Sequence, residues 1–140
     1  MFERYSDLAH LAIFFARKEA GETGAASIDT EHLLIGILSV DPELPNQLGI
    51  DLDARSISNQ CKQLSLPGPA IADTVEMTIT TDLGRVFAHA ISVADVRQCR
   101  EIRTEHLVAS LFEHGGHAAK ILADFRLEEK TITSLLTMID

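Results

Sequence analysis

Two glutamates occupy the same place in a short motif that occurs twice in the chain. Thr30-Glu31-His32-Leu33 returns as Thr104-Glu105-His106-Leu107, 74 residues later. A carboxylate can bind a planar guanidinium through charge-assisted hydrogen bonds, and the free N–H groups of a helix start can bind an anion. The simpler interpretation is that each acid only complements a helix dipole, which is worth about 0.3–1 kcal/mol. Glu31 and Glu105 are therefore candidate ligand-binding residues with a structural alternative.

Histidines and carboxylates also occur in pairs at a spacing that metal ligands use. The pairs are Asp29-x-x-His32, Asp7-x-x-His10 and His114-x-x-His117. A zinc or di-iron site needs more ligands at fixed spacing than these pairs supply, so we expect no metal and no cofactor. The alternative is a helical metal-binding enzyme that uses the pairs, which metal analysis of the purified protein would detect. We expect His32 and His106 to serve structure, with each ring packed inward and one nitrogen bonded to a neighbouring loop.

The remaining reactive groups do not indicate an enzyme. Cys61 and Cys99 form no Cys-x-x-Cys pair, and we interpret both as small core residues of a reduced cytoplasmic protein. The chain contains no Gly-x-x-x-x-Gly-Lys-Ser/Thr motif, which excludes a phosphate-binding loop of that type and an ATPase built on it. The sequence therefore predicts a non-enzymatic protein.

Composition narrows the class of partner. The 140 residues are 46% hydrophobic and 24% charged, with a formal net charge of −9, which fits one ordinary soluble domain. The excess of acid argues against a nucleic-acid binder, because phosphate contacts need clustered Lys and Arg. The longest apolar run, 11–16, is far too short to span a membrane. We expect a monomer in the cytoplasm whose partner is a protein or a small cationic ligand.

The elements that position the motif repeat with it. We predict a single unit over 1–140, with repeat one at 1–64, a linker at 65–78 around Pro67-Gly68-Pro69, and repeat two at 79–140. Apolar residues at helical spacing predict an all-α fold of two pseudo-symmetric four-helix repeats, eight helices in total. Only 75–80 has strand-like character. The last helix of each repeat is expected at about 53–64 and 128–139, and Pro42 and Pro45 shorten the third helix of repeat one.

Caps and apolar faces complete the expected helices. Ser6, Asp29, and Thr80 or Thr81 can cap helix starts through their side-chain oxygens, and Gly21 and Gly24 can end the first helix. Phe14 and Phe15 beside Ile13 make the first helix apolar on more than one face, which predicts burial between the repeats, with an exposed partner groove as the alternative. The apolar positions expected on buried faces are Leu8, Leu11, Ala12 and Phe15 in repeat one, and Leu83, Val86, Phe87, Ala90, Ile91 and Ala94 in repeat two.

The repeated motif carries a family resemblance. Two copies of a four-helix unit, each with Thr-Glu-His-Leu at the start of its second helix, resemble the N-terminal domain of the Clp-family AAA+ unfoldases, most closely the ClpC branch. Residues 28–36, Leu48-Gly49-Ile50 and 102–107 carry the likeness. The resemblance implies a non-catalytic module that receives substrate or adaptor proteins for a Clp ATPase ring coupled to a ClpP-type protease. It leaves open whether the chain is a free-standing protein or the front of a longer unfoldase.

The resemblance also implies a ligand. ClpC-type N-domains can bind phosphorylated arginine, with the glutamate of each Thr-Glu-His motif facing the guanidinium and a hydroxyl residue near the phosphate. The matching positions here pair Ser6 with Glu31 and Thr80 with Glu105. The glycine that the family usually carries before the motif is Asp29 in repeat one and Arg103 in repeat two, so this chain departs from the family pattern beside both glutamates.

Overall fold

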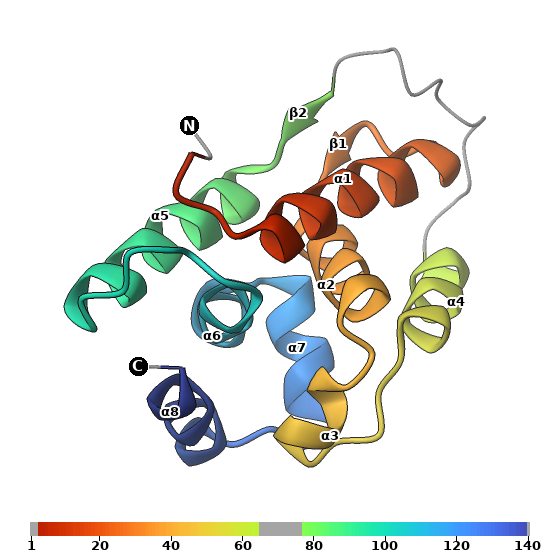
Figure 1. The fold of residues 1–140 in the computed structure, drawn as a ribbon. Coiled ribbons are helices and arrows are strands. Elements are labelled where there is room, and N and C mark those ends of the chain that lie inside the picture. Colours follow the sequence, from red (N-terminus) through yellow and green to blue (C-terminus); the bar gives the residue numbers. More distant parts are fainter. Residues whose placement is uncertain (1–2, 65–76, 140) are drawn as a thin grey trace.

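The chain folds into helices joined by two short pairings of extended backbone. A computed structural model describes residues 3–64 and 77–139, and Figure 1 shows the arrangement. The eight helices of these described residues agree with the predicted all-α class and lie within a few residues of the expected bounds. They are α1 (Asp7–Glu22), α2 (Thr30–Val40), α3 (Leu44–Leu48), α4 (Ala54–Leu64), α5 (Thr81–Val96), α6 (Thr104–His114), α7 (His117–Asp124) and α8 (Glu129–Met138).

The segment just before the first helix of each repeat pairs with the segment just before the second helix of the other repeat. Strand β1 (Ser27–Ile28), just before α2, runs parallel to β2 (Thr78–Ile79), just before α5. In the same way Tyr5, just before α1, forms a parallel bridge with Ile102, just before α6. The start of α1 is thus fixed beside the start of α6, and the start of α5 beside the start of α2. The strand character expected within 75–80 is confirmed at Thr78 and Ile79, and its partner β1 was not predicted.

The predicted caps are present. The Ser6 hydroxyl accepts a hydrogen bond from Ala9 N at 3.2 Å, and the Thr80 hydroxyl accepts one from Leu83 N at 3.1 Å. Gly24 takes a left-handed φ of 71° after α1, whereas Gly21 stays inside the helix as a buried residue. These hydroxyls satisfy N–H groups that a helix start leaves free.

Helices α1 and α2 are packed through small residues. A Cβ atom added at Gly36 would lie 2.2 Å from the backbone oxygen of Ala12 and 3.0 Å from Ala16 N. Only a glycine at this position lets α2 lie so close to α1. The side of α1 that faces α2 accordingly consists of small residues, mostly alanines. The buried residues on that side are Ala9, Ala12, Ala16, Ala20 and Gly21.

The expected buried face of α1 is therefore wrong in its large residues. Leu8 and Leu11 are 46% and 44% exposed, and Phe14 is 59% exposed, while Phe15 is half-buried. The spacing of apolar residues predicted that α1 would bury the side with its largest apolar side chains. Close contact between two helices instead favours the side with small side chains. Burial of Phe14, the expectation from sequence, is also wrong, since α1 exposes an apolar strip formed by Leu8, Leu11 and Phe14.

The two repeats share one hydrophobic core. Residues from both repeats form a single buried cluster, and α2 contacts α5, α6 and α7 while α3 contacts α8. The predicted face of α5 is confirmed except at Ile91, which is exposed. Cys99 is half-buried against the core, and the side chain of Cys61 lies outside the described residues. The sequence left open whether the repeats share a core.

The third helices differ in length between the two repeats, as expected. Helix α3 has only five residues, with Pro45 in its first turn, against eight in α7. Most of the expected linker, 65–76 with Pro67-Gly68-Pro69, lies outside the described residues, and its last residue, Thr78, begins β2. None of the helices in the described part of the chain is long and apolar enough to cross a membrane.

Candidate functional site

The motif glutamates lie at the starts of α2 and α6, which are equivalent in the two repeats. The hydroxyl residue expected beside each glutamate lies at the other motif instead. A surface hollow of about 290 Å³ is lined by both Ser6 and Glu105. The Thr80 hydroxyl donates to Asp29 Oδ1 at 2.8 Å, two residues before Glu31. The expected pairing of Ser6 with Glu31 and of Thr80 with Glu105 is therefore corrected. The physical reason is the crossed pairing of the segments before these helices, which sets each hydroxyl beside the motif of the other repeat.

The first of these places, the Glu31 site, consists of Asp29, Glu31, Thr80 and His117. The Glu31 side chain is 15% exposed, and its Oε2 atom has no hydrogen-bond partner among the described residues. His117 Nδ1 lies 3.6 Å from Glu31 Oε2 and 4.0 Å from Asp29 Oδ2. A buried carboxylate oxygen without a hydrogen bond is costly, so this atom is suited to accept one from a ligand.

The second place, the Glu105 site, consists of Ser6, Arg103, Thr104 and Glu105. Arg103 Nε donates to Glu105 Oε2 at 3.1 Å, and the Thr104 hydroxyl donates to Oε1 at 2.9 Å. Both carboxylate oxygens of Glu105, whose side chain is 9% exposed, are thus satisfied within the protein. The guanidinium of Arg103 is thus paired with the Glu105 carboxylate.

The residue before each motif decides this difference between the two sites. Asp29 and Arg103 are equivalent in the two repeats, and each lies just before its helix. Asp29 uses Oδ1 to accept from Thr30 N at 2.8 Å, so it caps α2 and adds negative charge beside Glu31. Arg103 instead neutralises Glu105. The negative charge of Glu105 is therefore balanced by a neighbouring arginine, whereas Asp29 adds to the negative charge beside Glu31.

The motif histidines hold the helix starts, as expected. His32 Nδ1 accepts from Asp29 N, and His106 Nδ1 accepts from Arg103 N, both at 2.9 Å. Both rings are buried. Burial lowers the pKa of His32 below its ordinary value, although the nearby carboxylates Glu31 and Asp29 oppose the shift. The neutral ring is the form that can accept this hydrogen bond.

We expect a His32→Gln variant to lose part of the acid sensitivity of the fold. Because the pKa of His32 is lower in the folded protein, the unfolded chain binds more protons below about pH 6.5, and the free energy of unfolding falls as the pH drops through that range. Glutamine at this third helical position can keep the bond to the backbone without titrating. Urea denaturation at pH 7.5 and 5.5 should show a smaller loss of stability in His32→Gln than in the wild type.

The matched control for this experiment is His10→Gln. His10 is exposed on α1 and is no part of a helix cap. This control should retain the wild-type loss of stability between the two pH values. An equal loss in His32→Gln and wild type would show that the buried ring does not contribute to the acid sensitivity.

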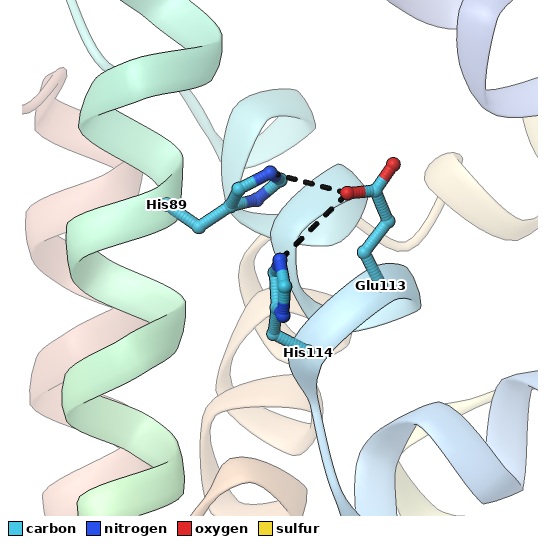
Figure 2. Close-up of side chains that lie close together, drawn as sticks. All are labelled: His89, Glu113 and His114. Atoms are coloured by element: carbon cyan, nitrogen blue, oxygen red, sulfur yellow. Dashed lines mark ion pairs between the residues drawn. The ribbon is translucent and has the colours of Figure 1, made fainter.

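No pair of possible metal ligands read from the sequence falls within one candidate metal-binding group in the described part of the chain. Other histidine and carboxylate side chains come together instead. His114 and His117, paired in the sequence, belong to different clusters, and His32 is committed to the cap of α2. Figure 2 shows His114 beside Glu113 and His89, which comes from α5. Sequence reasoning did not single out His89 or Glu113, and it considered His117 only beside His114, because the distances between α5 and α6 and between α2 and α7 have no local signature.

Comparison with known proteins identifies the family of the chain. The family model described as the Clp repeat (R) N-terminal domain matches residues 4–125. The chain is 28% identical over 134 residues to the chloroplastic chaperone protein ClpD of Arabidopsis thaliana, a match that covers 87% of this chain and 14% of the relative. It is 26% identical over 137 residues to a probable ATP-dependent Clp protease ATP-binding subunit of Chlamydia pneumoniae, covering 94% and 16%. The chain thus spans about one sixth of the length of these relatives.

Solved structures show the same fold. The crystal structure of the N-terminal domain of ClpD from Arabidopsis thaliana matches with a TM-score of 0.79 at 24% identity, over 99% of this chain and 95% of that one. The N-terminal domain of Hsp104 from Candida albicans matches with a TM-score of 0.75 at 15% identity, over 96% and 89%. At these identities the likeness concerns the fold.

Proposed function

The chain belongs to the Clp repeat N-terminal domain family, and from this premise we propose that it is a non-catalytic module that binds substrate or adaptor proteins for a Clp ATPase–protease system. The match of the family model over residues 4–125 is the observation that carries the proposal. The apolar strip on α1 supports it, because exposed aromatic and aliphatic side chains in a row are typical of protein-binding surfaces.

We propose further that the Glu31 site takes an arginine side chain of the bound protein, phosphorylated arginine included. Glu31 Oε2 makes no hydrogen bond to the described residues, and Asp29 adds to the negative charge. The start of α5, capped by Thr80, lies against Asp29 and offers first-turn N–H groups near which a phosphate is favoured. Because Arg103 fills the Glu105 site, the two sites are not equivalent in this protein.

A transfer experiment tests the module. The chain is fused to a Clp ATPase ring from which the native N-terminal domain has been removed, and degradation of an N-domain-dependent substrate by the ring with its protease is followed. We expect the fusion to restore degradation to within about threefold of the intact ring. A helical domain of similar size from an unrelated protein is the control. A fusion no faster than this control would contradict the proposal.

A further inference from the structure

We propose that His89, Glu113 and His114 form a binding site for one divalent transition-metal ion of the zinc class. The three side chains come together from the middle of α5 and the C-terminal end of α6 (Figure 2). This inference is independent of the protein-binding function proposed above. It replaces the expectation from sequence that the chain has no metal site.

The distances suit a single ion. Glu113 Oε2 lies 3.1 Å from His89 Nε2 and 3.8 Å from His114 Nε2, and one ligand atom from each residue falls within 4.8 Å of the others. Bonds of about 2.0–2.2 Å to a tetrahedral ion place neighbouring ligand atoms about 3.3–3.6 Å apart. Small side-chain rotations would therefore bring all three atoms to bonding distance.

The hydrogen bonds of Ser110 fix which nitrogen of His89 is free. The Ser110 hydroxyl donates its one proton to the backbone oxygen of Val86, so toward His89 Nδ1, 3.3 Å away, it can act only as an acceptor. A hydrogen bond here therefore requires an N–H at Nδ1, which leaves Nε2 as the nitrogen that would bind a metal beside Glu113. A histidine that ligates a metal is commonly oriented in this way by a hydrogen bond at its other nitrogen.

The contacts among the three side chains are compatible with a metal ion between them. His89 Nε2 lies 3.1 Å from the carboxylate oxygen of Glu113, a contact that a metal ion bound to both atoms would also satisfy. His114 lies too far from that oxygen, at 3.8 Å, for a hydrogen bond. The rings of His89 and His114 are 4.4 Å apart between centroids, so two imidazolium charges would repel each other. One metal ion satisfies all three atoms at once.

The location favours a cation and leaves a coordination position open. Glu113 and His114 are the last residues of α6, where the helix dipole is negative. The three side chains are partly exposed, and a groove of about 280 Å³ lined by His89, Glu113 and Glu129 runs alongside. Two imidazoles and a carboxylate are the ligands of zinc rather than of magnesium or calcium, which prefer oxygen.

The second cluster of the described residues, Asp29, Glu31 and His117, serves as the comparison. It offers one imidazole and two carboxylates, with His117 3.6–4.0 Å from the acids. Its ligand set is poorer for zinc because it has a single nitrogen donor. His117→Gln is therefore the matched control for substitutions at the proposed site.

Zinc titration of the untagged protein tests the site. By equilibrium dialysis and calorimetry we expect one Zn²⁺ per chain, no binding of Mg²⁺ at the same concentrations, and a Tm higher by about 5–10 °C at zinc 100 times above Kd. His89→Gln and His114→Gln should each weaken zinc binding at least about 100-fold, since even loss of a residue that supports a ligand costs about 10–100-fold. His117→Gln should bind as the wild type does.

Each other outcome overturns the proposal. Less than one equivalent of zinc on the wild-type chain would exclude the site, and so would undiminished binding by His89→Gln and His114→Gln. Loss of zinc in His117→Gln alone would place the ion at the Glu31 site. All three substituted side chains are partly or largely exposed, and an unchanged Tm without zinc would confirm that the variants are folded.

Discussion

A Gly36→Ala variant is expected to be less stable than the wild type by about 3 kcal/mol, which corresponds to a Tm lower by about 10 °C for a chain of this size. The added Cβ would lie 2.2 Å from the oxygen of Ala12 and 3.0 Å from Ala16 N. Both are backbone atoms of α1, so no side-chain rotation can relieve the contact. Helices α1 and α2 would have to separate, which would loosen the packing of the alanine side of α1. Urea and thermal denaturation measure the loss.

Gly84→Ala is the control, because it makes the same chemical change in a helix that has room for it. A Cβ at Gly84, in α5, would meet only Ile79 Cδ1 at 3.9 Å. Alanine is favoured over glycine inside a helix by about 1 kcal/mol, so this variant should be slightly more stable than the wild type. A Gly36→Ala protein as stable as the wild type would disprove the close contact of α1 with α2.

Binding of a phosphoarginine peptide is expected to fall about 10–100-fold in a Glu31→Gln variant. The substitution keeps the shape of the side chain but removes the charge that would pair with the guanidinium, and a hydrogen bond to a charged group is worth about 1.5–3 kcal/mol. The matched Glu105→Gln change should alter affinity by less than about threefold, because Arg103 already occupies that carboxylate. Calorimetry with the phosphoarginine peptide and with its unmodified arginine form gives both affinities.

Removal of Arg103 provides the complementary test. Arg103→Ala should free Glu105 and raise the number of peptides bound from one to two per chain, while adding Glu105→Gln to Glu31→Gln should weaken binding little beyond Glu31→Gln alone. Equal losses in the two single variants would show that the sites are equivalent and that Arg103 does not fill one of them. If the wild-type chain bound neither peptide, the proposed arginine ligand would be excluded. The proposed binding of substrate or adaptor proteins would not be affected by that result.

Much of the local structure follows from the sequence. The hydroxyl and carboxylate caps at Ser6, Asp29 and Thr80, the short α3 beside Pro45, and the buried side of α5 depend on residues within a few positions of each other. Such neighbours lie on one helix turn, so their types and spacing are enough. The repeated Thr-Glu-His-Leu motif predicted the family, which the match over residues 4–125 confirms.

What the tertiary structure decided concerns residues far apart in the chain. Pairing of Tyr5 with Ile102 and of β1 with β2 exchanges the hydroxyl partners of the two glutamates, and strands of one or two residues have no detectable period. The burial of alanines on α1, and not of Leu8 and Leu11, depends on how closely Gly36 lets α2 approach. His89 meets Glu113 and His114 only because α5 packs on α6.

The sequence alone determined the helices, their caps and the repeat, because these depend on near neighbours. Contacts between helices fixed which hydroxyl lies beside which motif and which histidines meet, because they depend on the distance between backbones.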